Sequence, residues 1–168
     1  MRQKIVPMDK QRNVPDNELI VSKTDLKGKI TYCNDIFIQL SGYRENELLG
    51  KAHNIVRHGD MPRIIFKLLW ENIQNGREIV AYVKNLAKDG AYYWVIAYVS
   101  PSFNEKGEII GYHSVRLKPK REAVSKIENL YAQLVQIEKE GNLAKSQAFL
   151  EEFLRKQGLN YEEYILSL

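Results

Sequence analysis

The chain has 168 residues, of which 44% are hydrophobic and 27% are charged, and its net charge is +4. These values are ordinary for one folded domain with an appendage, and the basic residues are too dispersed to favour nucleic-acid binding over a solvated surface. The single cysteine, Cys33, excludes an internal disulfide and suits a reducing compartment. Since there is no apolar run of membrane-spanning length and no signal-peptide core, we expect a cytoplasmic protein.

An arm and a hairpin are predicted first. Residues 1–17 are polar and show no periodicity, which predicts a mobile or loosely docked N-terminal arm. Two short strands, Leu19–Lys23 and Lys29–Cys33, flank a turn in which Gly28 can take a positive φ without steric cost. We therefore expect these strands to form an antiparallel hairpin.

Three helical segments follow, and the third is the longest. Asn34 is a good N-cap for a short helix, and a second helical turn, Glu45–Leu49, ends at Gly50. The long helix begins at Pro62 and ends near Asn75. Because this helix is apolar over most of its circumference, we expect it to be buried on more than one side.

Three further strands are predicted from alternating, β-branched and aromatic sequence, at Glu78–Leu86, Ala91–Ser100 and Glu108–Leu117. The two connections between them contain glycine, as hairpin turns often do. Five strands joined mostly by hairpins predict an α+β fold. In it, one five-stranded antiparallel sheet carries the short helices and the long helix on one face.

The remaining chain is predicted to be helical. Arg121–Glu140 has apolar residues at steps of three and four, and Leu143–Gln157 forms a second helix. Asn160 and Glu163 have the spacing of a capping box, which predicts the start of a last short helix.

The predicted organisation is an N-terminal arm (1–17), a central domain (18–119) and a C-terminal helical extension (120–168). The apolar stripe from Val124 to Ile137 is suited to pairing with another helix. Packing back on the central domain and forming a homodimer fit the same pattern equally well.

A polar cluster stands directly before the long helix. It contains His53, Arg57, His58 and Asp60. Polar groups beside an apolar interior usually have a partner there. Position alone nevertheless favours solvated basic residues, and a closed metal site would need a fourth ligand that the sequence does not offer.

The order of the elements and a set of short motifs resemble the PAS domain of bacterial aerotaxis receptors over residues 18–118. The most specific motif is His53-Asn54-Ile55-Val56-Arg57-His58-Gly59-Asp60-Met61-Pro62, which a generic PAS domain does not carry. Others are Asn34-Asp35, Ser41-Gly42-Tyr43, Val83-Lys84-Asn85 and Tyr93-Trp94.

This resemblance implies a PAS fold, a non-covalently bound FAD and a role as a redox sensor in energy taxis or aerotaxis. In the familiar receptors a membrane anchor, a HAMP unit and a kinase-control coiled coil follow the PAS domain, whereas here the helical extension follows. The chain is therefore similar to the CetB-like soluble PAS component of a bipartite energy-taxis system. The implied partner is a membrane-bound signalling protein with HAMP and chemotaxis kinase-control regions (CetA-like), which would recruit the chain to the inner face of the membrane.

The resemblance also implies roles for residues of the polar cluster. Arg57 and His58 would contact the phosphates or the adenosine portion of FAD, for which a planar guanidinium is well suited. Asp60 would accept a hydrogen bond from a ribose hydroxyl, or it would cap the helix that begins at Pro62.

Aromatic and amide side chains would surround the flavin ring. Trp70 and Phe66 lie one helical turn apart and would form a wall beside it, although ordinary core packing is the alternative for Phe66. Asn34 and Asn85 would face its polar edge, because an amide both donates and accepts. Their alternatives are helix capping and a strand-end turn, respectively. His53 completes the cofactor set. In a haem-binding PAS domain, His53 or His58 would instead be a candidate iron ligand.

The leading hypothesis is an FAD-binding redox sensor that signals through protein contacts. We do not expect an enzyme, because no nucleophile–base pair, phosphate-cradling glycine loop or kinase motif is evident. The alternatives are a cofactor-free PAS docking module and a haem-binding gas sensor.

Overall fold

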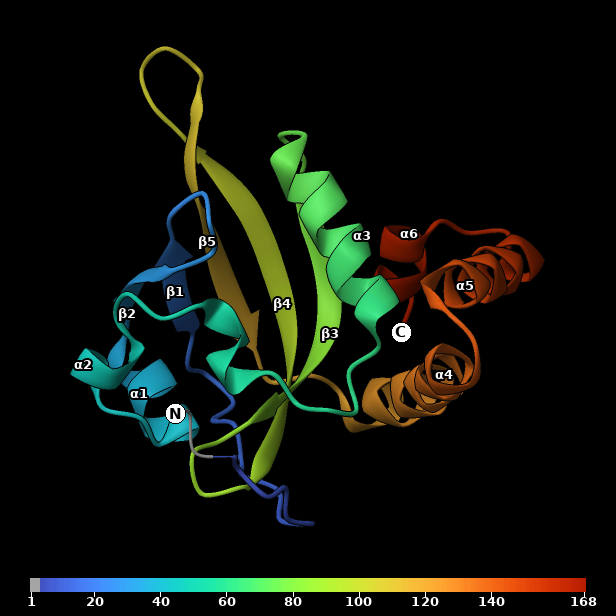
Figure 1. The fold of residues 1–168 in the computed structure, drawn as a ribbon, viewed down its shortest axis with the longest axis horizontal. Coiled ribbons are helices and arrows are strands. Elements are labelled where there is room, and N and C mark those ends of the chain that lie inside the picture. Colours follow the sequence, from blue (N-terminus) through green and yellow to red (C-terminus); the bar gives the residue numbers. More distant parts are fainter. Residues whose placement is uncertain (1–3) are drawn as a thin grey trace.

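A computed structural model describes residues 4–168 of the chain. Its sheet has five strands, β1 (Ile20–Thr24), β2 (Ile30–Cys33), β3 (Ile79–Leu86), β4 (Tyr92–Phe103) and β5 (Ile109–Leu117). All neighbours are antiparallel and the order is β2-β1-β5-β4-β3 (Figure 1). The predicted α+β class and five-stranded antiparallel sheet are confirmed.

One face of the sheet carries α1 (Asp35–Ser41), α2 (Glu45–Leu48), the 3₁₀ turn η1 (His53–Val56) and α3 (Arg63–Gln74). Figure 1 shows α3 lying along β3 and β4, which it contacts. Phe37, Leu48, Val56 and Ile65 come from these four segments and are buried against the strands. The apolar residues that predicted each helix thus form one side of the core.

The C-terminal extension packs on the other face of the sheet, beside β3. It consists of α4 (Arg121–Glu140), α5 (Leu143–Gln157) and α6 (Tyr161–Leu166) (Figure 1). Trp94 of β4 points to this face, because it alternates with Tyr93 along the strand. The ring of Trp94 lies 6.1 Å from that of Tyr131 on α4, whose hydroxyl donates to the carbonyl of Tyr82 at 2.7 Å. Of the three expected arrangements, the extension adopts packing on its own domain.

The extension also caps the N-terminus of α3. The N-cap residue, Pro62, offers no side-chain acceptor. Instead, Glu138 of α4 accepts hydrogen bonds from the N–H groups of Arg63 and Ile64 at 2.8 and 2.9 Å. The alternative in which Asp60 caps this helix is therefore wrong, because a distant carboxylate already binds the first N–H groups of α3.

The N-terminal arm is docked rather than loose. Gln11 forms a parallel bridge to Tyr92 of β4. The guanidinium of Arg12 forms an ion pair with Asp89 at 2.8 Å. A Cβ at Gly90 would collide with the main chain of the arm, so glycine permits this close approach. The expected mobile or loosely docked arm is corrected accordingly for residues 4–17; its first residues, 1–3, lie outside the described part of the chain.

Loops pair with the main chain at both edges of the sheet. Beside β2, the N–H of Ile30 donates to the carbonyl of Lys51, and the N–H of Gly50 donates to the carbonyl of Ile30, each at 2.8 Å. Beside β3, Arg57 forms an antiparallel bridge to Asn85. These contacts fix η1, which lies between them in the sequence, against the sheet.

Local predictions differ from the structure mainly at the end of β4. This strand continues through Pro101, which lies opposite Tyr112, and ends at Phe103. The predicted strand ended at Ser100. The missing N–H of Pro101 is tolerated where a strand is irregular, and a register shift follows between Ser102 and Phe103. The predicted helix caps at Asn34 and Asn160 are confirmed.

Candidate functional site

A cavity of about 280 Å³ lies between the sheet and α3. Residues of β1, β3, β4 and β5 form one side of it, and residues of α3, η1 and the β1–β2 turn form the other. The volume is near the lower bound of about 300 Å³ that is typical of small-molecule pockets. This inner cavity is the first candidate for a ligand site.

Aromatic rings line one wall of the inner cavity. Trp70 of α3 meets Tyr112 of β5 edge to face, with ring centroids 5.4 Å apart. Two features favour glycine at position 28. Its φ is +77°, which side chains disfavour, and a Cβ there would come within 3.1 Å of the Trp70 ring. The guanidinium of Arg57 lies 4.2 Å from the ring centroid of Phe66. Such a wall suits a flat, largely apolar ligand.

Polar side chains face the same cavity from the strands. Asn85 of β3 and Ser114 of β5 are buried and line it. The amide of Asn85 can both donate and accept, and the hydroxyl of Ser114 can do the same. A ligand with an apolar face and a polar edge fits this division of the walls.

Arg116 of β5 is a buried cation in the wall of the inner cavity, with 3% of the residue exposed. It donates to Ser22 Oγ at 2.9 Å and to His53 Nε2 at 3.1 Å, while its Nε has no hydrogen-bond partner within residues 4–168. Burial lowers the pKa of Arg116 to about 10, and the groups that raise it are Tyr93 and Cys33 rather than a carboxylate. The guanidinium therefore remains charged near neutral pH and leaves one donor unused beside the cavity.

Ser22 and His53 have the spacing of a nucleophile and its base, with Oγ 2.9 Å from Nε2. Since Arg116 can only donate to Nε2, the ring proton of a neutral His53 is on Nδ1. Burial and then the charge of Arg116 lower the pKa of His53 to about 3. So weak a base cannot remove the Ser22 proton near neutral pH, and the pair is therefore unsuited to nucleophilic catalysis.

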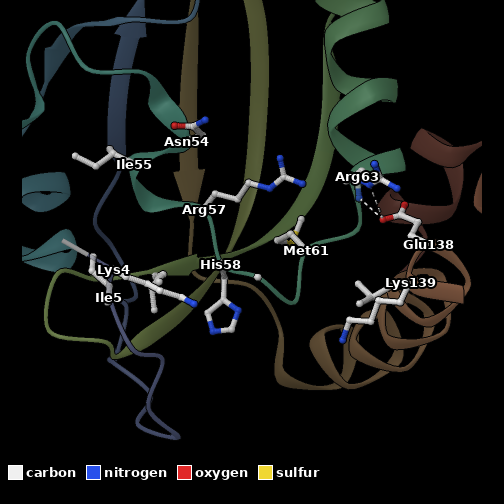
Figure 2. Close-up of a pocket in the computed structure, with 13 residues that line it drawn as sticks. Lys4, Ile5, Asn54, Ile55, Arg57, His58, Met61, Arg63, Glu138 and Lys139 are labelled. Atoms are coloured by element: carbon white, nitrogen blue, oxygen red, sulfur yellow. Dashed lines mark hydrogen bonds and ion pairs between the residues drawn. The ribbon is translucent and has the colours of Figure 1, made fainter. Parts of the chain in front are cut away.

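A second cavity of about 700 Å³, open to solvent, adjoins the inner one (Figure 2). Asn54 and Arg57 line both, so the two spaces are neighbours that share these side chains. We call the second cavity the outer groove. Burial lowers the pKa of Arg57, the carboxylate of Glu138 raises it and the charge of Arg63 lowers it. Arg57 is thus within electrostatic reach of both α3 and α4.

His58 lines the outer groove as a neutral ring. The N–H of Asp60 donates to Nδ1 of His58 at 3.0 Å, which leaves the ring proton on Nε2. Burial and then the charge of Lys84 lower the pKa of His58. The carboxylate of Asp60 binds Lys84 Nζ at 2.8 Å. Burial acts to raise the pKa of Asp60, but the hydrogen bond from Lys84 and the nearby positive charges together outweigh it and lower that pKa.

The structure gathers most of the predicted site residues around these two spaces. The inner cavity is lined by His53, Arg57, Phe66, Trp70 and Asn85. His58 lines the outer groove. Asn34 and Asp60 line neither, because the Asn34 amide bonds to the main chain around α1 and Asp60 pairs with Lys84. The ligand roles of all eight residues stay predictions.

Sequence reasoning missed Arg116 and Ser22. Both stand at inward positions of strands, at the step of two that also places Tyr112 and Ser114 in the cavity wall. A charged residue at such an alternating inward position was the available signal.

Residues 4–168 contain no group of three or more His, Cys, Asp or Glu side chains placed to hold a metal ion. Within the same range, no helix has both the length and the apolar character needed to cross a bilayer.

Solved structures of light-oxygen-voltage domains share this fold. A domain studied with a flavin analogue aligns with a TM-score of 0.58 at 18% identity, covering 65% of this chain and 82% of that one. The light state of the blue-light photoreceptor Aureochrome1 LOV aligns with a TM-score of 0.55 at 23% identity, covering 75% and 93%. At these identities the likeness concerns the fold alone.

The chain belongs to the PAS-fold family, whose model matches residues 30–116. It is 42% identical over 130 residues to the aerotaxis receptor of Escherichia coli, covering 76% of this chain and 26% of the receptor. It is 28% identical over 96 residues to the biofilm dispersion protein BdlA of Pseudomonas aeruginosa, covering 56% and 23%. The chain thus spans about a quarter of the length of these curated relatives.

Proposed function

We propose that this chain is a redox sensor for energy taxis that binds FAD non-covalently, with the flavin ring in the inner cavity and the rest of the dinucleotide in the outer groove. The observation that carries the proposal is the composition of the inner cavity. Trp70, Phe66 and Tyr112 provide an apolar wall, while Asn85 and the unbalanced charge of Arg116 provide a polar side. A flavin ring has a flat apolar face and a polar edge, and it fits such a division.

A bound flavin would supply reversible electron acceptance. The residues of the cavity would hold it and tune it. Arg116 keeps a fixed positive charge in a buried wall, which favours negative charge at the ring edge. Asn85 can reverse its hydrogen bond when a ring atom gains a proton. The aromatic wall of Trp70 and Tyr112 limits the access of water.

The signal would leave the chain through a protein contact. A partner reads redox state only if its contacts differ between the two states. The similarity to an aerotaxis receptor supports a membrane-bound partner with chemoreceptor-like signalling regions, to which this chain would be recruited from the cytoplasm. Pairing with a second copy of the chain is the alternative, and the two are separated by measuring mass in solution with and without the partner.

The haem and cofactor-free alternatives have less support. The two candidate iron ligands are already engaged: His53 Nε2 accepts hydrogen bonds from Ser22 and Arg116, and His58 Nδ1 accepts one from the N–H of Asp60. A cofactor-free module would fill its core with side chains, whereas a cavity of about 280 Å³ lies there.

The first test is the absorption spectrum of the freshly purified protein, followed by identification of the cofactor released on denaturation. We expect flavin bands that bleach on reduction, and FAD in the supernatant. A haem band, or a protein that remains colourless after incubation with FAD, would contradict the proposal.

The second test compares variants in each wall. We expect Arg57→Ala and Trp70→Ala to retain less FAD than the wild type while keeping its circular dichroism spectrum. Arg57 lines both spaces, and Trp70 lines the inner cavity. Arg155→Ala on the surface of α5 and Tyr98→Ala on the exposed side of β4 are the matched controls. Full FAD occupancy in both site variants would remove the basis for this assignment.

A further inference from the structure

The outer groove has one wall that belongs to the C-terminal extension. Arg57, His58 and Arg63 line it from the segment around η1 and α3, and Val135, Glu138 and Lys139 line it from α4 (Figure 2). The three α4 residues share one helix face, since they stand three and four positions apart. In the view of Figure 2, Lys139 and Lys4 reach in from opposite sides of His58.

The groove carries an excess of positive charge. Its lining includes four cationic side chains, Lys4, Arg57, Arg63 and Lys139, and one carboxylate, Glu138. The carboxylate accepts from two N–H groups of α3 and from Ser146 Oγ at 3.0 Å, and it pairs with Arg63 at 3.7 Å, which leaves the other three cations. An anion placed in the groove would therefore meet mainly cations and the Nε2–H of His58.

The position of the groove beside the inner cavity indicates which kind of anion it would bind. It shares Arg57 and Asn54 with the inner cavity, so the groove is the neighbouring space into which a ligand with its ring in the cavity could extend past these side chains. A mononucleotide flavin would end with its single phosphate near Arg57. Only the second phosphate and the nucleoside of a dinucleotide would reach the α4 wall.

We propose, on the basis of the proposed function, that α4 completes the dinucleotide site, and that Lys139 is a specificity residue that favours FAD over FMN and riboflavin by binding its diphosphate. The C-terminal extension is then part of the cofactor site as well as a cover for the sheet. Because binding couplings are reciprocal, FAD stabilises the docked position of α4 by the same factor by which docked α4 tightens FAD.

The test measures the dissociation constants of FAD, FMN and riboflavin with the full chain after flavin removal, at low and moderate salt. The wild type is expected to bind FAD most tightly and to lose part of that preference as salt screens the groove. Lys139→Gln is expected to weaken FAD binding by about three- to five-fold, as for a partly exposed charge pair. Lys139→Glu is expected to weaken it further, and riboflavin binding should be unchanged in both variants. Lys126→Gln and Lys126→Glu, at an exposed lysine of the same helix, are the controls.

Hydrogen exchange gives a readout that does not depend on affinity. FAD, but not riboflavin, is expected to slow amide exchange over residues 135–139 in the wild type and less so in Lys139→Glu. Equal loss of FAD and riboflavin binding in the Lys139 variants, or FAD binding that ignores Lys139, would overturn this inference and leave the flavin sensor intact. A wild type that binds none of the three flavins would overturn both.

Discussion

His53 is held neutral by its surroundings. Partly buried beside Arg116, it has a pKa of about 3 in the folded chain, whereas an unfolded histidine has its ordinary value of 6.5. Between these values the unfolded chain binds a proton that the folded chain does not. The contribution of His53 to the free energy of unfolding is therefore complete above pH 6.5 and is lost as the pH falls.

Because the free energy of unfolding falls with pH through His53, the variant His53→Gln should change the pH dependence of stability. From pH 7 to pH 5 the free energy of unfolding of the apo wild type should fall by about 2 kcal/mol through His53, at about 1.4 kcal/mol per pH unit. The variant should lack this loss, while its glutamine can still accept from Arg116. Urea unfolding of both proteins at pH 7, 6 and 5 tests this, and curves that remain parallel would contradict it. This range of pH lies above the range in which surface carboxylates mainly titrate.

At the scale of elements, α3 depends on a residue from another helix. The side chain of Glu138 is only 7% exposed. It accepts hydrogen bonds from the first N–H groups of α3 and from the hydroxyl of Ser146. Since α3 also carries Phe66 and Trp70, this one carboxylate ties the cavity wall to the extension. No residue next to α3 in the sequence does this.

We expect Glu138→Ala to lower the free energy of unfolding by about 1 to 2 kcal/mol, which is the usual cost of losing an N-cap acceptor. Buried Ser146 would keep the carbonyl of Leu143 as an acceptor at 2.9 Å, so the effect should come mainly from the lost cap. Glu128→Ala, at an exposed position of the same helix, is the control and should change stability little. Equal melting curves for Glu138→Ala and Glu128→Ala would show that the cap contributes nothing.

The elements that could be predicted from the sequence are those with local signals. Gly28 marked the hairpin turn, and Asn34 and Asn160 marked helix starts, because each acts within a few residues of its own position. The cap by Glu138, the docking of Arg12 and the Ser22–His53–Arg116 cluster depend on residues far apart in the chain. The alternation of inward polar residues on β5 was the one trace of that cluster in the sequence.

At the scale of the molecule, the extension covers apolar surface that the sheet would otherwise expose. Val80, Tyr82 and Trp94 of β3 and β4 are buried and belong to the same core as Ile127, Leu130 and Tyr131 of α4. This surface is one reason that the central domain and the extension form a common core.

Removing residues 120–168 is therefore expected to produce a chain that self-associates and melts at a lower temperature, because Trp94 and its neighbours become exposed. Size-exclusion chromatography with light scattering at several concentrations measures the first effect, and circular dichroism melting the second. The same truncation carrying Tyr82→Thr and Trp94→Thr should associate less. A truncated chain that is monomeric and as stable as the whole protein would contradict this reading of the interface.

The paired edges of the sheet restrict how another protein can bind. Segments around Lys51 and Arg57 already use main-chain groups of β2 and β3, and the hydroxyl of Tyr131 takes a further carbonyl of β3. Edge strands with free main-chain groups invite strand addition by other chains and, in the extreme, fibril growth. Because these groups are engaged, fewer main-chain groups are free for strand addition. Recognition by a partner would then rest on side chains on the faces of the molecule, where sequence can change the choice of partner without rebuilding the sheet.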